Sequence, residues 1–506
     1  MEPIVLEICA AVSEAGGRAM LVGGSVRDLL LGIQSKDFDI EVYGLSPAEL
    51  RKVLESTGRV NAVGEQFAVY KVSVVRSGTV QDSRRIGKPA EAPEGSGAQT
   101  TLQEARDTSR DSSSGERIEI DVSIPRRESK SGSGHRGFLI SGDPTMTFED
   151  ASRRRDFTVN AILFDPLTRE TIDPWGGAED LRRRILRAVS AETFVEDSLR
   201  VLRAMQLAAR FEMTIEPATV TLCRSIDLSD LPRERVWGEI EKLLGAARPS
   251  IGLQAALDLL ILDKLFPAIK ALDGCPQDPK VHPEGDVFVH TRLAVDQAAQ
   301  FARDLPRAKR LTVMLATLLH DAGKPLTATE VDGKTRHPNH DEAGVEPAAS
   351  VLDAIGMYTV DGYDVRSQVL ALIREHLLPA RMYKCKDVVP AGEFRRLARK
   401  VDLGLLYLVA KADALGRGPG FSADAEDWFI QRAREIGVEH GPPEPLLLGR
   451  HLIEAGIEPG PRMGEILREV YELQLDGAVT TLTEARQAAN RIAPAIGPTR
   501  DPSAMS

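Results

Sequence analysis

The sequence lacks the features that would place the chain in a membrane or an oxidising compartment. Its 506 residues contain no run of about 18 apolar residues, the length that a membrane-spanning helix requires. Residues 1–17 lack a basic segment, and acidic residues interrupt their apolar stretch, which predicts an amphipathic helix rather than a signal peptide. Only four cysteines occur, and none forms a CxxC pair. This spacing excludes a cysteine zinc site and favours a reducing cytoplasm.

Net positive charge is also missing, since the formal net charge is −11. This excludes a nonspecific nucleic-acid coat, although RNA binding through local basic surface stays open. Arg153–Arg155 and Arg182–Arg184 are the clearest basic runs, and each is as easily a solvated face. The chain is 42% hydrophobic and 27% charged, which is typical of a globular protein. Its length predicts two to four domains.

Strand and helix signals alternate only in the N-terminal part. From about Gly177 onward the pattern is almost wholly helical. The segment Ser77–Glu116 is rich in polar and charged residues and has no aromatic residue, which predicts a disordered insertion between two strands. The expected early elements are strands at residues 19–22, 38–43, 66–75 and 117–124, and a helix at 25–31 with Ser25 as its N-cap.

The segment from Leu21 to Gly44 carries the first chemical signal. Gly23–Gly24 stands between an expected strand and helix, where glycines allow close approach to a phosphate and the helix start offers N–H donors. Asp37 and Asp39 are two residues apart, so on a strand they share a face. Two such carboxylates suit Mg²⁺ and two-metal nucleotidyl transfer. A third acid is needed, and Asp121 is the candidate, with Glu119 on the same face as its competitor.

These residues carry a family resemblance. Four motifs in order resemble those of the class II tRNA nucleotidyltransferase and bacterial poly(A) polymerase family. They are Gly23–Asp28 with Asp37–Asp39, Arg154–Ala161 (the RRDFTxNA motif), Asp173–Leu181 (DPxGGxxDL) and Glu196–Arg203 (EDxLRxLR). Four ordered motifs are far more specific than one short pattern.

The resemblance implies roles for individual residues. Asp37 and Asp39 are expected to hold Mg²⁺ and Asp121 to act with them as the third catalytic acid. Asp197 and Arg200 are expected to face the base, because a carboxylate and a guanidinium together offer acceptors and donors. The residues implied in nucleotide binding are Gly23, Gly24, Arg27, Arg155, Asp197, Arg200 and Arg203.

Addition of CCA to tRNA and addition of poly(A) share these motifs. The resemblance favours CCA addition, because Glu65-Gln66 precede Phe67 where poly(A) enzymes carry a basic pair. The segment Glu128–Gly134 also resembles a flexible loop of the CCA subgroup that carries an HD domain. One departure is Gln206, where the family usually has a basic residue. A poly(A) polymerase, or an enzyme that adds only CC or only A and has a vestigial HD domain, is therefore the alternative.

The segment Ala316–Lys324 resembles the HDxGK core of HD-domain phosphohydrolases. The resemblance implies a site for a divalent cation (Mg²⁺, Mn²⁺, Ni²⁺ or Co²⁺), since imidazole and carboxylate together suit such ions. Hydrolysis of 2′,3′-cyclic phosphates and other phosphoesters is the implied activity. The implied ligands are His290, His320, Asp321 and Asp413, with His340 and His376 as secondary candidates.

The expected fold class is α+β, a nucleotidyltransferase palm with a mixed sheet followed by an all-α body that includes an HD domain. The expected partners are the tRNA 3′ end, ATP and CTP, with no membrane and with a homodimer left open. The expected domains are the catalytic head (1–176), a helical neck and body for templating and RNA binding (177–272), the HD domain (273–418) and a C-terminal helical segment (419–506).

Overall fold

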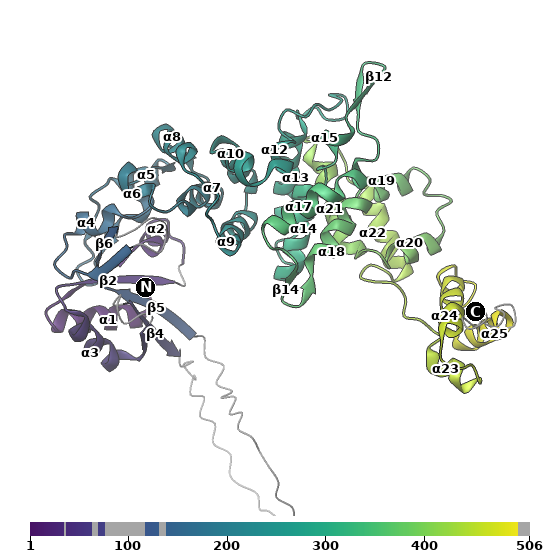
Figure 1. Cartoon of the computed structure of the whole chain (residues 1–506), viewed down its shortest axis with the longest axis horizontal. Coiled ribbons are helices and arrows are strands. Elements are labelled where there is room, and N and C mark those ends of the chain that lie inside the picture. The colour runs from purple at the N-terminus through teal and green to yellow at the C-terminus, as the bar shows by residue number, and fades with distance from the viewer. Residues whose placement is uncertain (35–36, 63–68, 76–116, 131–137, 494–506) are drawn as a thin grey trace, which may run out of the picture. The chain divides into compact units, whose positions relative to one another are not determined.

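The structure is a computed structural model that describes residues 1–34, 37–62, 69–75, 117–130 and 138–493 (Figure 1). The expected insertion at 77–116 and the residues Glu65–Phe67 lie outside the described residues, as does most of the expected loop at 128–134. The chain forms two compact units, residues 1–183 with 187–194 and residues 184–186 with 195–506. The expected α+β class is confirmed, whereas the finer division into four domains stays a prediction.

The first unit contains a seven-stranded mixed sheet with the strand order β3-β4-β5-β2-β1-β8-β9. Its central pair, β2 and β5, is parallel, and the other neighbours are antiparallel. The strands are β1 (Arg18–Val22), β2 (Phe38–Tyr43), β3 (Arg59–Ala62), β4 (Val69–Val75), β5 (Arg117–Ser123), β8 (Leu163–Phe164) and β9 (Thr171–Ile172). A separate hairpin pairs β6 (Arg126–Lys130) with β7 (Phe138–Gly142).

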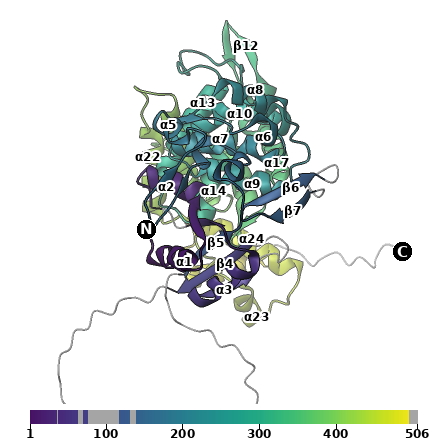
Figure 2. The ribbon, with the colours of Figure 1, turned by 90° about the vertical axis from the view of Figure 1, so that its left-hand side faces the viewer.

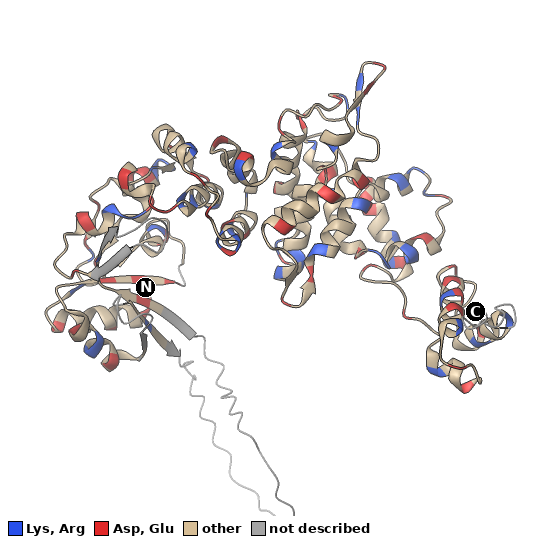
Figure 3. Cartoon of the chain, viewed as in Figure 1, with Lys and Arg blue, Asp and Glu red and all other residues tan. Residues whose placement is uncertain are grey.

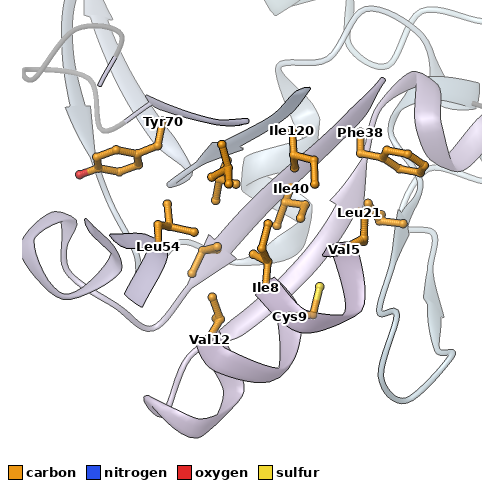
Figure 4. Close-up of a cluster of buried hydrophobic side chains, with 14 of the residues drawn as sticks. Val5, Ile8, Cys9, Val12, Leu21, Phe38, Ile40, Leu54, Tyr70 and Ile120 are labelled. Atoms are coloured by element: carbon orange, nitrogen blue, oxygen red, sulfur yellow. The ribbon is translucent and has the colours of Figure 1, made fainter. Parts of the chain in front are cut away.

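Two helices cover one face of this sheet. Ile8 and Val12 of α1 pack with Leu54 of α3 against Ile40 and Ile120 of the sheet (Figures 2 and 4). Side chains alternate along a strand, so this packing leaves every second residue of β2 on the opposite face. The helices of the unit are α1 (Pro3–Glu14), α2 (Gly24–Leu30), α3 (Pro47–Thr57), α4 (Phe148–Arg153), the 3-10 helix η1 (Thr158–Asn160), α5 (Gly177–Arg182) and α6 (Ala191–Phe194).

The start of α2 differs from the expectation. Gly23 is its N-cap, with φ of 72°, a backbone conformation that glycine adopts without strain. Ser25 is therefore inside the helix and buried, and its hydroxyl donates to the carbonyl oxygen of Val22. The expected N-cap at Ser25 is wrong, because the N-cap is Gly23, two residues earlier.

Gly177 holds two of the sequence motifs together. A Cβ atom at this position would lie 2.0 Å from the carbonyl oxygen of Thr158, which only glycine avoids. Beside it, the Thr158 hydroxyl donates to Asp180, and Asp180 also accepts from Arg187. The second and third motifs thus form one packed element of the head.

We expect Gly177→Ala to destabilise the protein by about 2–3 kcal/mol, because the added methyl forces the backbone of η1 apart. Urea unfolding measures the change. Gly238→Ala is the matched control, since Gly238 is inside a helix and no atom lies within 4 Å of a Cβ added there. The control is expected to be neutral or more stable by up to ~1 kcal/mol. Equal stability of the two variants would contradict the packing argument.

The second unit is helical, as expected, apart from three short two-stranded sheets. Figure 3 shows residues of both charge signs interspersed over its helices. The sheets pair β10 (Ile185–Leu186) with β11 (Thr214–Ile215), β12 (Thr329–Val331) with β13 (Lys334–Arg336), and β14 (Thr359–Val360) with β15 (Tyr363–Asp364). The first part contains α7 (Leu199–Phe211), α8 (Pro217–Ser225), α9 (Arg233–Leu244), α10 (Pro249–Asp258), α11 (Ile261–Leu265) and α12 (Pro267–Lys270).

The middle of this unit is a packed bundle in which α13 and α21 lie side by side and α14 contacts both. Its helices are α13 (Val287–Phe301), α14 (Arg307–Leu319), α15 (Lys324–Thr327), α16 (His340–Ala343), α17 (Val345–Ala354), α18 (Val365–Glu375), α19 (Leu378–Tyr383), α20 (Ala391–Leu397), α21 (Leu403–Gly416) and α22 (Asp424–Ile436). A separate apolar cluster joins the last three, α23 (Gly449–Glu454), α24 (Pro461–Leu475) and α25 (Leu482–Ile492).

Candidate active and metal sites

Three carboxylates meet on the open face of the head sheet. Asp39 lies on β2 directly opposite Asp121 of the parallel strand β5. Asp37 immediately precedes β2, and both Asp37 and Asp39 are exposed while their neighbours Phe38 and Ile40 are buried. The register therefore places Asp121, rather than Glu119, across from Asp39. The structure thus brings Asp121 next to Asp39 and Asp37, as the resemblance implied, and the competitor Glu119 lies two residues away on β5.

Arg155 brings positive charge to the same face. Its Nη2 lies 3.9 Å from Oε1 of Glu41, which follows Asp39 by two residues on β2. A Cβ on Gly23 would lie 3.1 Å from Nη1 of Arg155 and 3.3 Å from Oδ2 of Asp39. Gly23 therefore leaves room for the guanidinium and the carboxylate at the position that a Cβ atom would occupy. On the far side of the acids, Lys71 Nζ lies 3.5 Å from Oδ1 of Asp121.

Arg27 is buried rather than open to solvent. Its guanidinium donates to Asn160 at 2.8 Å and to Asp28 at 2.7 Å, and it is 5% exposed. Asn160 in turn donates to Asp156 at 3.0 Å. The chain of hydrogen bonds links the first motif to the second, so Arg27 fixes the position of the turn at Gly24, which lies against its guanidinium.

The candidate base-reading residues belong to the second unit. Asp197 precedes α7, and its carboxylate accepts from the backbone N–H of Leu199, so it lies before the helix that carries Arg200. Arg235 of α9 pairs with Asp197 at 3.2 Å. Arg200 and Arg203 lie half-buried on the first turns of α7.

Gln206 occupies the position where the sequence departs from the family. Its side chain is 2% exposed within α7, and its Oε1 has no hydrogen-bond partner in the part of the chain that the structure describes. A basic residue at this position would need a buried counter-ion. The glutamine at position 206 therefore faces the packed core around α7 and not the solvent.

A second cluster brings together residues from five segments of the helical unit. His290 of α13 contacts Asp413 of α21, with 3.0 Å between Nε2 and Oδ1. His320, at the end of α14, lies 3.2 Å from Asp321 and 4.0 Å from Asp413. All four expected ligands are buried and adjacent. The resemblance implied these four residues, and the structure brings them together although their sequence positions span more than a hundred residues.

The histidines of this cluster are held in one orientation. The Nδ1 atoms of His320, His340 and His376 each lie 2.6–2.8 Å from the backbone carbonyl oxygen three residues earlier. A carbonyl accepts a hydrogen bond only, so each Nδ1 carries the proton and each Nε2 is the free ligand atom. Burial lowers the pKa of His376 to about 4, which keeps its imidazole neutral at pH 7.

The carboxylates of the cluster are held ionised. Burial alone would raise the pKa of Asp321, but the adjacent His320 and the charge of Lys324 hold it well below its usual range. Burial is likewise outweighed at Asp413, where the hydrogen bond from His290 and the charge of Arg417 lower the pKa. Ionised oxygens suit a divalent cation, and binding of one would release the proton that Nε2 of His290 donates to Asp413.

The orphaned polar atoms of this cluster also fit a cation. Nε2 of His320 and both carboxylate oxygens of Asp321 are buried and form no hydrogen bond with any described residue. Buried polar atoms of this kind normally have a partner, and the ligand atoms of His290, His320 and Asp321 lie within 4.8 Å of one another, which supports a metal centre.

Three contributors were not found from the sequence. Glu284 accepts from Nδ1 of His290 at 2.7 Å and from His282 at 2.8 Å, an outer contact that orients a candidate metal ligand. Lys324 pairs with Asp321 at 2.7 Å, and Arg417 lies 3.6 Å from Asp413. The sequence contained two weak signals for these contributors. The H-x-E spacing of His282 and Glu284 is one, and the lysine at the end of the HDxGK pattern is the other.

The stability of the protein depends on pH through Glu426 of α22, which is buried near Asp413. Burial, and next the negative charge of Asp413, raise its pKa to about 7. In the unfolded chain the group loses its proton near pH 4.5, so stability falls as pH rises from 4.5 through 7. We expect Glu426→Gln to remove this loss of stability in chelator-treated protein. At pH 8 the variant should have a free energy of unfolding higher than that of the wild type by up to ~3 kcal/mol.

Urea unfolding at pH 4.5 and pH 8 measures this effect. At pH 4.5 the two proteins are expected to be equally stable, since the wild-type carboxyl is then protonated in the folded state. Glu435→Gln, an exposed change on the same helix, controls for the loss of a surface charge. A variant that gains no stability at pH 8 would contradict the raised pKa.

No described helix is long and apolar enough to span a membrane. All four cysteines are free, and three of them are buried. None of these cysteines belongs to the two clusters.

Comparison with known families matches three parts of the chain. Residues 19–187 match the poly A polymerase head domain, and residues 287–418 match the HD domain. Residues 212–272 match a domain described as a "Probable RNA and SrmB- binding site of polymerase A". The first match contains the three carboxylates, and the second contains the four expected ligands of the histidine cluster.

Solved structures share this fold at low sequence identity. The CCA-adding enzyme of Bacillus stearothermophilus in complex with CTP aligns with a TM-score of 0.61 at 19% identity, covering 98% of this chain and 99% of that chain. The CCA-adding enzyme of Thermotoga maritima complexed with tRNA aligns with a TM-score of 0.55 at 20% identity, covering 97% and 96%. At this identity the likeness shows the fold alone.

Curated relatives are more similar in sequence. The multifunctional CCA protein of Xanthomonas campestris is 32% identical over 461 residues, which cover 88% of this chain and 95% of that protein. The multifunctional CCA protein of Stenotrophomonas maltophilia is 33% identical over 409 residues, covering 78% and 86%. Because the identity extends through both the head and the HD domain, the chain belongs to the multifunctional CCA protein family.

Proposed function

We propose that this protein adds cytidylate and adenylate residues to the 3′ end of tRNA. The observation that carries the proposal is the register of β2 and β5, which sets Asp39 opposite Asp121 with Asp37 beside them. The curated relatives that align with this chain over almost their whole length are multifunctional CCA proteins. We also propose that the enzyme works in the cytoplasm, where its free cysteines stay reduced.

In this proposal the three carboxylates hold Mg²⁺, whose oxygen-ligand preference they satisfy. Bound there, the cation would activate the primer hydroxyl and stabilise the leaving pyrophosphate. The reaction forms a bond from the 3′-oxygen of the primer to the α-phosphorus of CTP or ATP. The bond from that phosphorus to pyrophosphate breaks, and the hydroxyl proton passes to solvent.

The remaining residues of the head orient the nucleotide. Gly23 and Gly24 permit close approach of the triphosphate, and Arg155 supplies positive charge next to the carboxylates. Arg27 holds this turn in place through its hydrogen bond to Asn160. The family motif further assigns recognition of the base to Asp197 and Arg200, with Arg203 as a neighbouring contact.

The test is nucleotide addition to tRNA that lacks its last three, two or one nucleotides, with CTP and ATP supplied separately and together. We expect CTP alone to extend the shortest tRNA by two residues, and ATP to add one residue only after CC. Extension that stops at CC, or that occurs only with ATP, would identify a partial adder and a consequence of Gln206. Long adenylate tails on unrelated RNA would overturn the proposal in favour of a poly(A) polymerase.

A second activity is proposed for the histidine cluster. His290, His320, Asp321 and Asp413 would hold a divalent cation, which when bound supplies an activated water for phosphoester hydrolysis. Lys324 and Arg417 flank the carboxylates and offer positive charge to a substrate phosphate. This activity would convert a damaged tRNA end into one that accepts a nucleotide.

Hydrolysis of 2′,3′-cyclic AMP and of p-nitrophenyl phosphate tests the second activity. The assay uses chelator-treated protein to which Mg²⁺, Mn²⁺, Ni²⁺ or Co²⁺ is returned singly. We expect release of product only after return of one of these ions. Absence of hydrolysis with all four ions would contradict the assignment and would indicate a vestigial HD domain.

A further inference from the structure

Asp197, the candidate base-reading carboxylate, is oriented by contacts from two helices. Its Oδ1 accepts from the backbone N–H of Leu199, at the start of α7, at 3.2 Å. Nη2 of Arg235, in α9, lies 3.4 Å from Oδ1 and 3.2 Å from Oδ2. The next residue, Ser198, donates its hydroxyl to Asp230 at 3.0 Å. The segment before α9 and its first turn therefore hold Asp197 and its neighbour in place.

Arg235 occupies a position where a helix does not favour a cation. Helix α9 begins at Arg233, so Arg235 lies in the first turn, where the helix dipole favours negative charge. The pair with Asp197 is also partly exposed, with 42% of the arginine side chain and 34% of the aspartate side chain accessible. An exposed pair of this kind contributes little to stability. A role in orienting the carboxylate explains the contact better than a role in stability.

The contacts to Asp197 leave part of its capacity to accept hydrogen bonds open. A carboxylate has about four lone-pair positions on its two oxygens. The N–H of Leu199 and the guanidinium of Arg235 use three of them. An ionised carboxylate accepts hydrogen bonds and donates none. It therefore suits the exocyclic amino group of cytosine or adenine, and it opposes the exocyclic oxygen of uracil or guanine.

We propose that Arg235 is a positioning residue that sets the choice of nucleotide by holding the Asp197 carboxylate in one orientation. The inference rests on the proposed addition of CMP and AMP and on the assignment of Asp197 to base recognition. Without the guanidinium, the carboxylate would keep only its contact with Leu199 and could rotate. A carboxylate that rotates loses its contact with an amino group and no longer opposes a carbonyl oxygen, so the discrimination between bases falls.

Addition to a tRNA that lacks its last three nucleotides tests this role, with CTP and UTP supplied separately. Arg235→Met keeps much of the apolar length of the side chain and removes its donors. We expect the ratio of kcat/KM for CTP to kcat/KM for UTP to fall about tenfold or more, the scale on which a hydrogen-bonded contact separates one base from another. A purely structural role would lower both values together and leave the ratio unchanged.

A double variant shows whether Arg235 acts through Asp197. Asp197→Asn places a donor on the same side chain and is expected to lower the ratio by itself. Addition of Arg235→Met to Asp197→Asn is expected to change the ratio by less than about twofold, because the carboxylate that the arginine holds is then gone. Arg235→Lys keeps the charge without the planar guanidinium, and its ratio is expected to lie between those of Arg235→Met and the wild type.

Arg233→Met is the matched control, because Arg233 is an exposed arginine of the same helix turn and does not pair with Asp197. It is expected to keep the ratio within about twofold of the wild-type value. Circular dichroism checks that each variant is folded, and Arg235→Gln replaces Arg235→Met if that variant does not fold.

The outcomes separate this inference from the function on which it rests. No addition of CMP by the wild-type protein would overturn both. An unchanged ratio in Arg235→Met or in Asp197→Asn, with CMP addition intact in the wild type, would overturn the role of Arg235 alone. An equal fall in Arg233→Met, or a further full fall when Arg235→Met is added to Asp197→Asn, would also overturn it, since the arginine would then act by another route.

Discussion

Asp39→Asn is expected to lower the rate of CMP addition to tRNA by at least about 1,000-fold, since loss of a ligand that stabilises transition-state charge costs roughly 4 kcal/mol. Asp39 is the central carboxylate of the three, being opposite Asp121 across the strand pair and two residues from Asp37. Asparagine keeps the shape of the side chain but loses its charge. Single-turnover extension of a tRNA that lacks its last three nucleotides measures the rate.

Glu55→Gln is the control for this variant. Glu55 is an exposed acid of the same unit that pairs only with its helix neighbour Arg51 among the contacts described. It is expected to leave the rate within about twofold, because an exposed ion pair of this kind is worth less than ~1 kcal/mol. If Asp39→Asn kept the wild-type rate, the assignment of the three carboxylates to a metal site would be wrong.

Asp321→Asn is expected to abolish phosphoester hydrolysis while it leaves nucleotide addition intact. Hydrolysis of 2′,3′-cyclic AMP should fall by about 1,000-fold or more, because the variant weakens the carboxylate that contacts His320 and His340 and that binds the cation. Addition of nucleotides to tRNA should stay within about twofold, since Asp321 lies in the helical unit and the three carboxylates lie in the head.

A control variant and a metal-binding measurement test this second prediction. Asp424→Asn, an exposed change at the start of α22, should leave both activities unchanged. Binding of Mn²⁺ should fall in parallel with hydrolysis in Asp321→Asn, which a defect in substrate binding alone would not produce. Loss of nucleotide addition in this variant would show that the two activities share a site, contrary to the assignment.

Local spacing predicted the parts of the molecule that depend on local geometry. The interval of two between Asp37 and Asp39 requires a common face once a strand is assumed, and β2 has the alternating burial that this demands. The adjacent His320 and Asp321 likewise follow from one short motif. The helical character after Gly177 was predicted because it depends on periodicity over long segments.

Other features depend on contacts that no local pattern encodes. The N-cap of α2 is Gly23 rather than Ser25, because the strand before it fixes where the turn begins. Glu284 reaches His290 only through the path of the chain before α13. Arg27 carries charge in a motif associated with nucleotides, yet its burial depends on Asn160, which is 133 residues away.

The pairing of β4 with β5 has a consequence for how this protein can change over evolutionary time. Val75 is opposite Arg117, while Asp121 lies four residues further along β5, so the chain leaves and re-enters the sheet away from the acid. Extending a connection costs only about 0.6 kcal/mol for each doubling of its length. Changes in the length of this connection over evolutionary time are therefore expected to leave the register of Asp121 unaltered, which insertion of a reporter domain between Val75 and Arg117 would test.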